Sequence, residues 1–202
     1  METPSFRDAI VECIRAQAQP LDKFSHQPRL YQTAVLVGEG QSYDDDVLFA
    51  AAWMHDLGVF IGHRPEEPAA LSTWDNVKYA LERTPGILNQ LGFPPEKIPA
   101  VVEAIRTHQP AAQPTTMEGA ILRDADILEQ LGAVGILRAV SKVGRDTRYL
   151  TFADALRVLQ RNLETLPQHL RLETSRQFAE PRVQVLRAFL EAAQAEADGE
   201  PL

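Results

Sequence analysis

The sequence predicts an all-α fold, and three observations support this prediction. Apolar residues recur at helical spacing throughout the chain, proline gathers in the segments between the helical stretches, and no alternating apolar and polar run is flanked by hairpin turns. The chain has 202 residues, of which 45% are hydrophobic, and this is enough for a core without disulfide staples. We therefore expect one all-α domain over residues 1–202.

The first half of the chain is expected to contain five helices. Pro28 and Pro95 suit the first turn of a helix, and the three aspartates at 44–46 are favoured at a helix N-terminus. Gly58 and Gly92 suit the positions where helices stop. These signals and the apolar periodicity predict helices near residues 4–18, 28–39, 44–57, 72–91 and 96–108.

The second half is expected to contain four more helices, near residues 116–130, 132–143, 152–166 and 173–197, with Gly132 as the break between the first two. The core is expected to span about 20–145, followed by a helical extension over about 150–195 and a frayed tail at 196–202. Val183, Leu186, Phe189 and Leu190 share one side of the last helix. That side closes the core or forms a dimer, so the chain is expected to be a monomer or a homodimer.

Composition excludes several classes of function. The formal net charge of -8 disfavours binding to a nucleic-acid polymer, although a divalent metal and a few arginines can reverse the field inside one cleft. The longest apolar run, at 47–54, is much shorter than the ~20 residues that span a bilayer. Cys13 is the one cysteine, and no N-terminal segment reads as a secretion signal. We expect a cytoplasmic protein with no membrane partner.

The segment "FAAAWMHDLG" contains the first candidate site residues, His55 and Asp56. A carboxylate near the C-terminus of a buried helix meets the negative end of the helix dipole and also loses water, so a positive group should compensate it. Neighbouring side chains on a helix can lean toward one point between them, and a metal ion suits that point. A helix cap or a local salt bridge would also explain this dipeptide.

Asp124 is the second unusual residue, in "EGAILRDADILEQLG". Ile121, Asp124, Leu128 and Leu131 fall on one helical face, so the carboxylate of Asp124 lies on an apolar stripe. Asp126 points roughly 200° away and is the weaker candidate. Asp124 is either a metal ligand or a buried carboxylate paired with an arginine such as Arg138.

Four of the five histidines, His26, His55, His63 and His108, lie at or just beyond predicted helix ends in the first 108 residues. Each alone would more simply be a core, cap or loop residue. Together with the aspartates they form the kind of set that a catalytic metal site requires, in which separate segments supply three or four ligands. His169 stands apart from this set.

The order His26, His55-Asp56, Asp124 resembles the HD-domain superfamily of metal-dependent phosphohydrolases. "RDADILEQLGAVGILR" is similar to the DADxLDxxGxxGxxR signature of a small, stand-alone bacterial branch, and the segment "LPQHLRLETSRQFAEPRVQVLRAFLEAAQAE" resembles its C-terminal helices. The likeness spans roughly residues 20–195. It implies an HD-domain-like helical bundle with additional C-terminal helices.

The resemblance implies that His26, His55, Asp56 and Asp124 bind one divalent metal, which we expect to be Mn, Mg, Ni, Co or Fe. His108 and His63 are candidates for a second metal or for substrate. The implied reaction is hydrolysis of a phosphoester or phosphoanhydride in a small phosphorylated substrate, such as a nucleotide, by metal-activated water. Asp56, with His55, is expected to carry the catalysis, and Asp56 would also accept the proton of the water.

The sequence departs from the family pattern in ways that concern the base and the substrate more than the metal. Glu129 stands where an aspartate often follows DADxL, Gln109 replaces a frequent serine, and Val59 replaces the glutamate of the HD nucleotidases. Phosphate contacts are expected from four cations, with Arg29 first; the others are Arg64, Lys78 and Arg138. A solvated surface charge is the simpler explanation for Arg64 and Lys78 and an equally good one for Arg29 and Arg138.

Two other functions are compatible with the same residues. One is a metal-containing sensor or binding domain that holds a nucleotide without hydrolysing it. The other is di-iron oxygenase chemistry, which some HD-like folds carry out with more histidine ligands, so the few histidines of this chain disfavour it. The fold alone does not choose among these three functions.

Overall fold

The computed structural model describes residues 5–146 and 148–198, and these residues confirm the all-α prediction. They form ten α-helices and no strand, and the one isolated bridge joins Ile61 to Arg64. The α-helices are α1 (Phe6–Gln17), α2 (His26–Val37), α3 (Asp45–Met54), α4 (Pro68–Ser72), α5 (Asn76–Gln90), α6 (Ile98–Thr107), α7 (Met117–Leu128), α8 (Gly132–Val140), α9 (Phe152–Thr165) and α10 (Glu173–Glu196). Four short 3-10 helices link them: η1 (Leu21–Lys23), η2 (Leu57–Val59), η3 (Pro95–Lys97) and η4 (Leu166–His169).

The predicted helices occur close to their expected positions, with three informative differences. The helix expected at 72–91 begins at Asn76, because the side chain of Asp75 caps it by accepting the backbone N–H of Lys78. The proline-rich segment before it contains the short helix α4, which was not predicted. The helix expected at 44–57 ends at Met54, and the chain continues into η2.

The chain divides into two compact units, Met1–Arg123 and Asp124–Leu202, which are called here the N-terminal and C-terminal units. The boundary falls inside α7. The prediction of one domain with a core at about 20–145 and an extension at about 150–195 stays a prediction.

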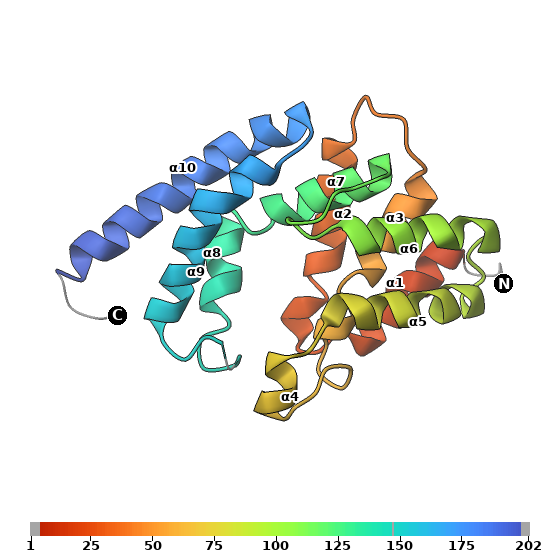
Figure 1. Ribbon diagram of the computed structural model, residues 1–202, viewed down its shortest axis with the longest axis horizontal. Helices are drawn as coiled ribbons and strands as arrows, with labels where there is room; N and C mark the ends of the chain where they lie inside the picture. Colours follow the sequence, from red (N-terminus) through yellow and green to blue (C-terminus); the bar gives the residue numbers. More distant parts are fainter. Residues whose placement is uncertain (1–4, 147, 199–202) are drawn as a thin grey trace. The chain divides into compact units, whose positions relative to one another are not determined.

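Helix α3 forms the centre of the N-terminal unit. Every residue from Val47 to Met54 is buried, because α1, α2 and α6 all pack against this helix (Figure 1). Helix α5 packs on α6 and on η2. A helix that is apolar on all sides must be surrounded by other helices, so the sequence of α3 itself requires this arrangement.

In the C-terminal unit, α8, α9 and α10 pack against one another (Figure 1). The turn between α7 and α8 is fixed by Gly132, which has φ of +66°, and by Arg182, which donates to the carbonyl of Leu128 at 2.7 Å. Burial lowers the pKa of Arg182, and nearby Glu129 acts in the opposite direction. Gly132 and Arg182 both belong to the stretches that resemble the bacterial branch, so part of this resemblance lies in a structural turn.

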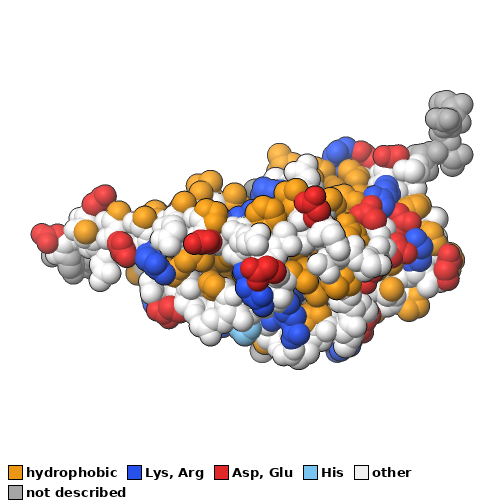
Figure 2. All heavy atoms as spheres, turned by 90° about the horizontal axis from the view of Figure 1, so that it is seen from above, with side chains coloured by type: hydrophobic (Ala, Val, Ile, Leu, Met, Phe, Trp, Pro, Cys, Tyr) orange, Lys and Arg blue, Asp and Glu red, His pale blue; other side chains and the backbone are white. Residues whose placement is uncertain are grey.

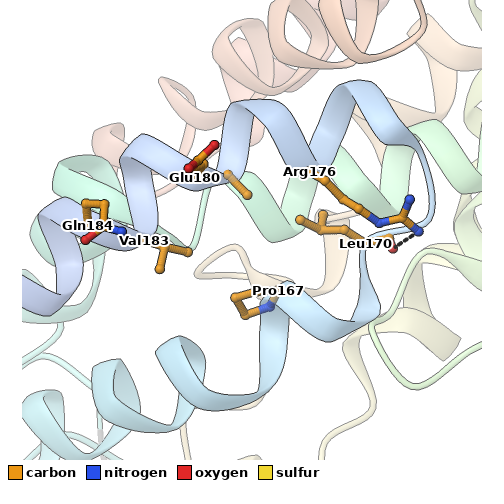
Figure 3. A pocket seen from close by; sticks show the side chains of 7 residues that line it. Pro167, Leu170, Arg176, Glu180, Val183 and Gln184 are labelled. Atoms are coloured by element: carbon orange, nitrogen blue, oxygen red, sulfur yellow. Dashed lines mark hydrogen bonds between the residues drawn. The ribbon is translucent and has the colours of Figure 1, made fainter.

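A small hollow of about 150 Å³ lies between η4 and the first half of α10 (Figure 3). Pro167, Leu170 and Val183 supply apolar walls, and Arg176 donates to the carbonyl of Leu170 at 3.2 Å. None of the predicted metal ligands lines it.

On the face shown in Figure 2, acidic and basic side chains are interspersed among hydrophobic ones. Among the described residues, no helix combines the length and the apolar character needed to cross a bilayer. Of the tail predicted to fray, residues 199–202 lie outside the described residues, and Ala197 and Asp198 form a turn after α10.

Candidate metal centre

The C-terminus of α3 places His55 at the edge of the core of the N-terminal unit. His55 caps the helix, its backbone N–H still donates to Ala51 at 3.0 Å, and its side chain is 1% exposed. Its ring Nδ1 lies 2.9 Å from the carbonyl oxygen of Ala52. Such a contact fixes Nδ1 as the protonated nitrogen, which leaves the Nε2 lone pair for a cation.

His26, His55 and Asp56 converge on one point. His26 is the first residue of α2 and is buried, and its Nε2 lies 3.7 Å from Oδ2 of Asp56. Nε2 of His55 lies 3.5 Å from the other carboxylate oxygen, Oδ1. One ligand atom from each of the three residues lies within 4.8 Å of the others. A cation at this point would compensate the carboxylate of Asp56 at the helix end.

His108 stands beside this group and repeats the local arrangement of His55. It caps the C-terminus of α6, is 5% exposed, and places Nδ1 2.5 Å from the carbonyl oxygen of Ile105. The ring centroids of His55 and His108 are 5.2 Å apart, and those of His55 and His26 are 5.5 Å apart. The structure therefore brings three of the predicted histidines together.

Asp124 belongs to the C-terminal unit, where it is fully buried. Its carboxylate accepts the backbone N–H of Leu172 at 2.8 Å and that of Arg171 at 2.9 Å, just before α10 begins. Arg138, the arginine considered as its partner, pairs with the buried Glu129 at 3.7 Å. Backbone donors thus offset part of the cost of burying Asp124.

The other three predicted phosphate contacts occupy varied positions in the N-terminal unit. Arg29, in the first turn of α2, donates to the carbonyl of Ser25 at 3.1 Å, and Lys78 on α5 lies 4.0 Å from Glu82 at an exposed position. Arg64 is half-buried in the turn that follows η2. Each remains a predicted contact.

His63 lies in the same turn, among aromatic rings. Its ring centroid is 5.8 Å from that of Phe60 and 5.5 Å from that of Tyr79. Burial, and to a smaller extent the positive charge of Arg83, lowers the pKa of His63, so this imidazole is neutral at pH 7. Its Nδ1 is buried without a hydrogen-bond partner.

Sequence reasoning missed two residues that shape this region. The indole of Trp74 donates to the carbonyl of Gly58 at 2.8 Å, which fixes the backbone two residues after Asp56. Arg123 is buried and donates to the carbonyl of Pro110 at 2.6 Å, two residues after His108. The sequence shows an arginine directly before Asp124 on the same predicted helix, which could have drawn attention to Arg123. No local sequence pattern indicates that Trp74 contacts Gly58.

Several solved structures resemble this chain. The crystal structure of Bacillus subtilis YpgQ in complex with ADP has a TM-score of 0.74 and 23% identity, and 96% of each chain is covered. A predicted HD-superfamily hydrolase from an uncultured Thermotogales bacterium has a TM-score of 0.65 and 26% identity, with 95% of this chain and 93% of that chain covered. An HD-superfamily hydrolase from Bacillus thuringiensis has a TM-score of 0.68 and 21% identity, with 96% and 97% covered.

No protein-family model matches the sequence, and no curated protein matches it. The solved structures therefore carry the comparison.

Proposed function

We propose that this chain, whose helical fold is that of the HD superfamily, is a metal-dependent hydrolase that cleaves a phosphoester or phosphoanhydride bond in a small substrate. The observation that carries the proposal is the convergence of His26, His55 and Asp56, each of which offers a ligand atom within 4.8 Å of the others.

These three residues suit a divalent cation chemically as well as geometrically. Two imidazoles and one carboxylate form a mixed nitrogen and oxygen donor set, which suits Mn, Fe, Co or Ni better than it suits Mg. The contact of His55 Nδ1 with Ala52 orients its ring as it would for a metal ligand. Manganese is the ion we expect first.

Asp124 is proposed as the fourth ligand. Its carboxylate is fully buried and accepts backbone N–H groups from Arg171 and Leu172, and the order His26, His55-Asp56, Asp124 supports this assignment. His108 is proposed for a second metal or for the substrate, because its ring lies 5.2 Å from that of His55.

When bound, the cation supplies a Lewis acid that lowers the pKa of water and offsets the negative charge on the phosphoryl oxygens. Asp56 is the residue that can receive the proton of the attacking water. Its side chain is 17% exposed, whereas those of His26 and His55 are 4% and 1% exposed, so solvent reaches Asp56 most easily. His26 and His55 hold their positions through burial at the ends of α2 and α3.

We further propose that the substrate is a nucleotide or a related phosphorylated compound. The solved structure of YpgQ contains ADP, and this supports a nucleotide as the first ligand to test. Arg29 is the first expected phosphate contact, because it lies one turn after His26 on α2. Arg64, Lys78 and Arg138 follow, and His63 is proposed to contact the substrate.

Hydrolysis by chelator-stripped protein tests this proposal. Nucleoside mono-, di- and triphosphates, pyrophosphate and general phosphate esters are assayed with Mn, Mg, Co, Ni or Fe added back. We expect turnover that depends on the metal and that Asp56→Asn abolishes. His169→Ala is the matched control, because His169 lies on η4 in the C-terminal unit, outside the proposed ligand set.

Two outcomes would contradict the proposed hydrolase. Metal binding without turnover of any compound in the panel, with ADP still bound by Asp56→Asn, would indicate a sensor that holds its ligand intact. Turnover that persists in Asp56→Asn would place the chemistry elsewhere in the molecule.

A further inference from the structure

A row of aromatic rings begins near the candidate metal centre, and of its members only His63 has a role in the proposed hydrolysis, as a substrate contact. The indole of Trp74 is tied to the carbonyl of Gly58, two residues from Asp56. Ring centroids of Trp74 and Tyr79 are 5.4 Å apart, and those of Tyr79 and His63 are 5.5 Å apart. All three side chains are half-exposed, so a ligand can reach them.

The backbone holds this row in place. A Cβ on Gly58 would lie 2.4 Å from the carbonyl oxygen of Asn76, so η2 and the first residue of α5 are in direct contact. The backbone N–H groups of His63 and Arg64 both donate to the carbonyl of Phe60 at 3.1 Å, which makes the segment after η2 a tight turn. Rings held by such contacts lose little freedom on binding.

The row also includes an exposed cation and a ring nitrogen that has no hydrogen-bond partner among the described residues. Arg83 is exposed on α5, four residues after Tyr79, and it has no ion pair among the residues that the structure describes. Residues four apart share a helix face. The neutral His63 beside it presents a buried Nδ1 that lacks a hydrogen-bond partner. A buried polar atom of this kind is costly unless a ligand or water satisfies it.

We infer that Trp74, Tyr79, His63 and Arg83 form a recognition subsite for the nucleoside part of a phosphorylated substrate. In this subsite the base stacks on Tyr79 beside Trp74, Arg83 attracts the phosphates, and Nδ1 of His63 bonds a polar atom of the ligand. Phosphate charge complements the uncompensated cation, and the planar base complements the exposed rings. The inference rests on the proposed nucleotide substrate and assigns its recognition to residues outside the metal ligands.

Direct binding tests this subsite without any turnover. Trp53 and Trp74 are the two tryptophans of the chain, and Trp53 is buried in the core, so Trp53→Phe leaves Trp74 as the reporter. Chelator-stripped Trp53→Phe protein is titrated with ADP and, separately, with ribose 5-phosphate, which has phosphate but no base. Calorimetric titration of the chain with both tryptophans repeats the measurement if Trp53→Phe folds poorly.

We expect ADP to change the emission of Trp74 and to bind more tightly than ribose 5-phosphate. Tyr79→Leu should weaken the binding of ADP about tenfold, because base stacking is lost, and leave the binding of ribose 5-phosphate unchanged. Arg83→Ala should weaken the binding of both ligands, and the effect should be larger at low salt. Arg161→Ala, an exposed arginine on α9 in the C-terminal unit, is the matched control and should bind both ligands as the parent protein does.

Equal affinity for ADP and ribose 5-phosphate, or unchanged ADP binding in both Tyr79→Leu and Arg83→Ala, would overturn the subsite. Hydrolysis plays no part in these titrations. A failed hydrolase assay with the expected binding pattern would therefore contradict the proposed reaction and leave the subsite standing.

Discussion

His55 and His108 illustrate how the end of a helix orients an imidazole ring. Each lies at a helix C-terminus and places Nδ1 near the carbonyl of the residue three positions earlier. The last carbonyls of a helix have no partner within the helix, so the ring also satisfies a backbone group. This local geometry follows from the helix ending, and it leaves Nε2 of both rings for other contacts.

His55→Ala is expected to reduce the affinity for Mn by at least about 100-fold, because loss even of an outer-shell partner of a ligand costs 10–100-fold. Calorimetric titration of the metal-free protein with Mn provides the measurement. His169→Ala should keep the affinity of the parent protein. Equal affinities in the two variants would exclude His55 from the metal site.

Gly58 has a steric role that stability measurements can isolate. Its missing Cβ allows η2 to approach the backbone of Asn76, so Gly58→Ala should lower the free energy of unfolding by about 1–3 kcal/mol through overpacking. Gly86, in the exposed part of α5, is the matched control, since a Cβ there meets nothing within 4 Å. Gly86→Ala should raise the free energy of unfolding by about 0.4–1 kcal/mol. Urea unfolding measures both, and a similar effect of the two substitutions would contradict the close approach.

Among the elements, helix α3 ends at the candidate metal centre and is anchored at its start. Asp44 caps its N-terminus by accepting the backbone N–H of Asp46 at 2.9 Å, and Lys97 contacts both carboxylates at 2.8 Å. Arg7 on α1 pairs with Asp46 at 2.6 Å and with Asp45 at 2.8 Å. The start of α3 is thus connected to α1 and η3, while its end carries His55.

The charges at the start of α3 predict a pH dependence of stability. For Asp44, burial acts to raise the pKa, but the hydrogen bonds from Lys97 and the backbone outweigh it, so the pKa lies below its ordinary value. Lys97, followed by Arg7, lowers the pKa of Asp46. A carboxyl group with a lowered folded-state pKa stabilises the fold above its unfolded pKa of about 3.9, and this stabilisation is lost as the pH falls through the folded value.

We therefore expect the urea midpoint to fall as the pH decreases below about 4, and Lys97→Met to lower the midpoint at pH 7 and flatten this acid dependence. Lys78→Met, which removes an exposed lysine that lies 4.0 Å from Glu82, should leave the dependence unchanged. Unfolding curves from pH 7 to pH 3 provide the test. If the urea midpoints of the unsubstituted chain, Lys97→Met and Lys78→Met fall in parallel as the pH decreases, carboxylates other than Asp44 and Asp46 control the acid dependence.

On the scale of the whole molecule, the proposed ligands come from distant parts of the sequence. His26, His55 and His108 belong to three helix termini of the N-terminal unit, and Asp124 is the first residue of the C-terminal unit. A cation that binds the folded chain and not the unfolded chain stabilises the fold by mass action. Removal of the metal should therefore lower the free energy of unfolding of the whole chain.

At a free Mn concentration 100 times the dissociation constant, the folded state should gain about 2.7 kcal/mol. We expect chelation to lower Tm of the unsubstituted chain and to have little effect on His55→Ala. Differential scanning calorimetry with and without chelator measures this. An equal fall of Tm in both proteins would mean that the stabilising metal binds at another place.

The sequence by itself determined the all-α class and the positions of most helices, and it indicated His26, His55 and Asp56 as candidate site residues. Continuous apolar patterning requires α3 to be surrounded by other helices, and Asp44 and Gly92 mark helix ends through local hydrogen bonding and backbone freedom. The His55-Asp56 pair and the buried position of Asp124 are visible because each breaks an apolar pattern at a helix face or end.

Only the tertiary structure decided which groups meet. It placed His26 beside His55 and Asp56, and it brought Arg138 to Glu129. It also gave Asp124 the backbone N–H groups that precede α10, 47 and 48 residues away. It brought Trp74 to Gly58 in the same way. Periodicity encodes which face of a helix is buried, but the partner on that face depends on how distant helices pack, and no local pattern specifies that packing.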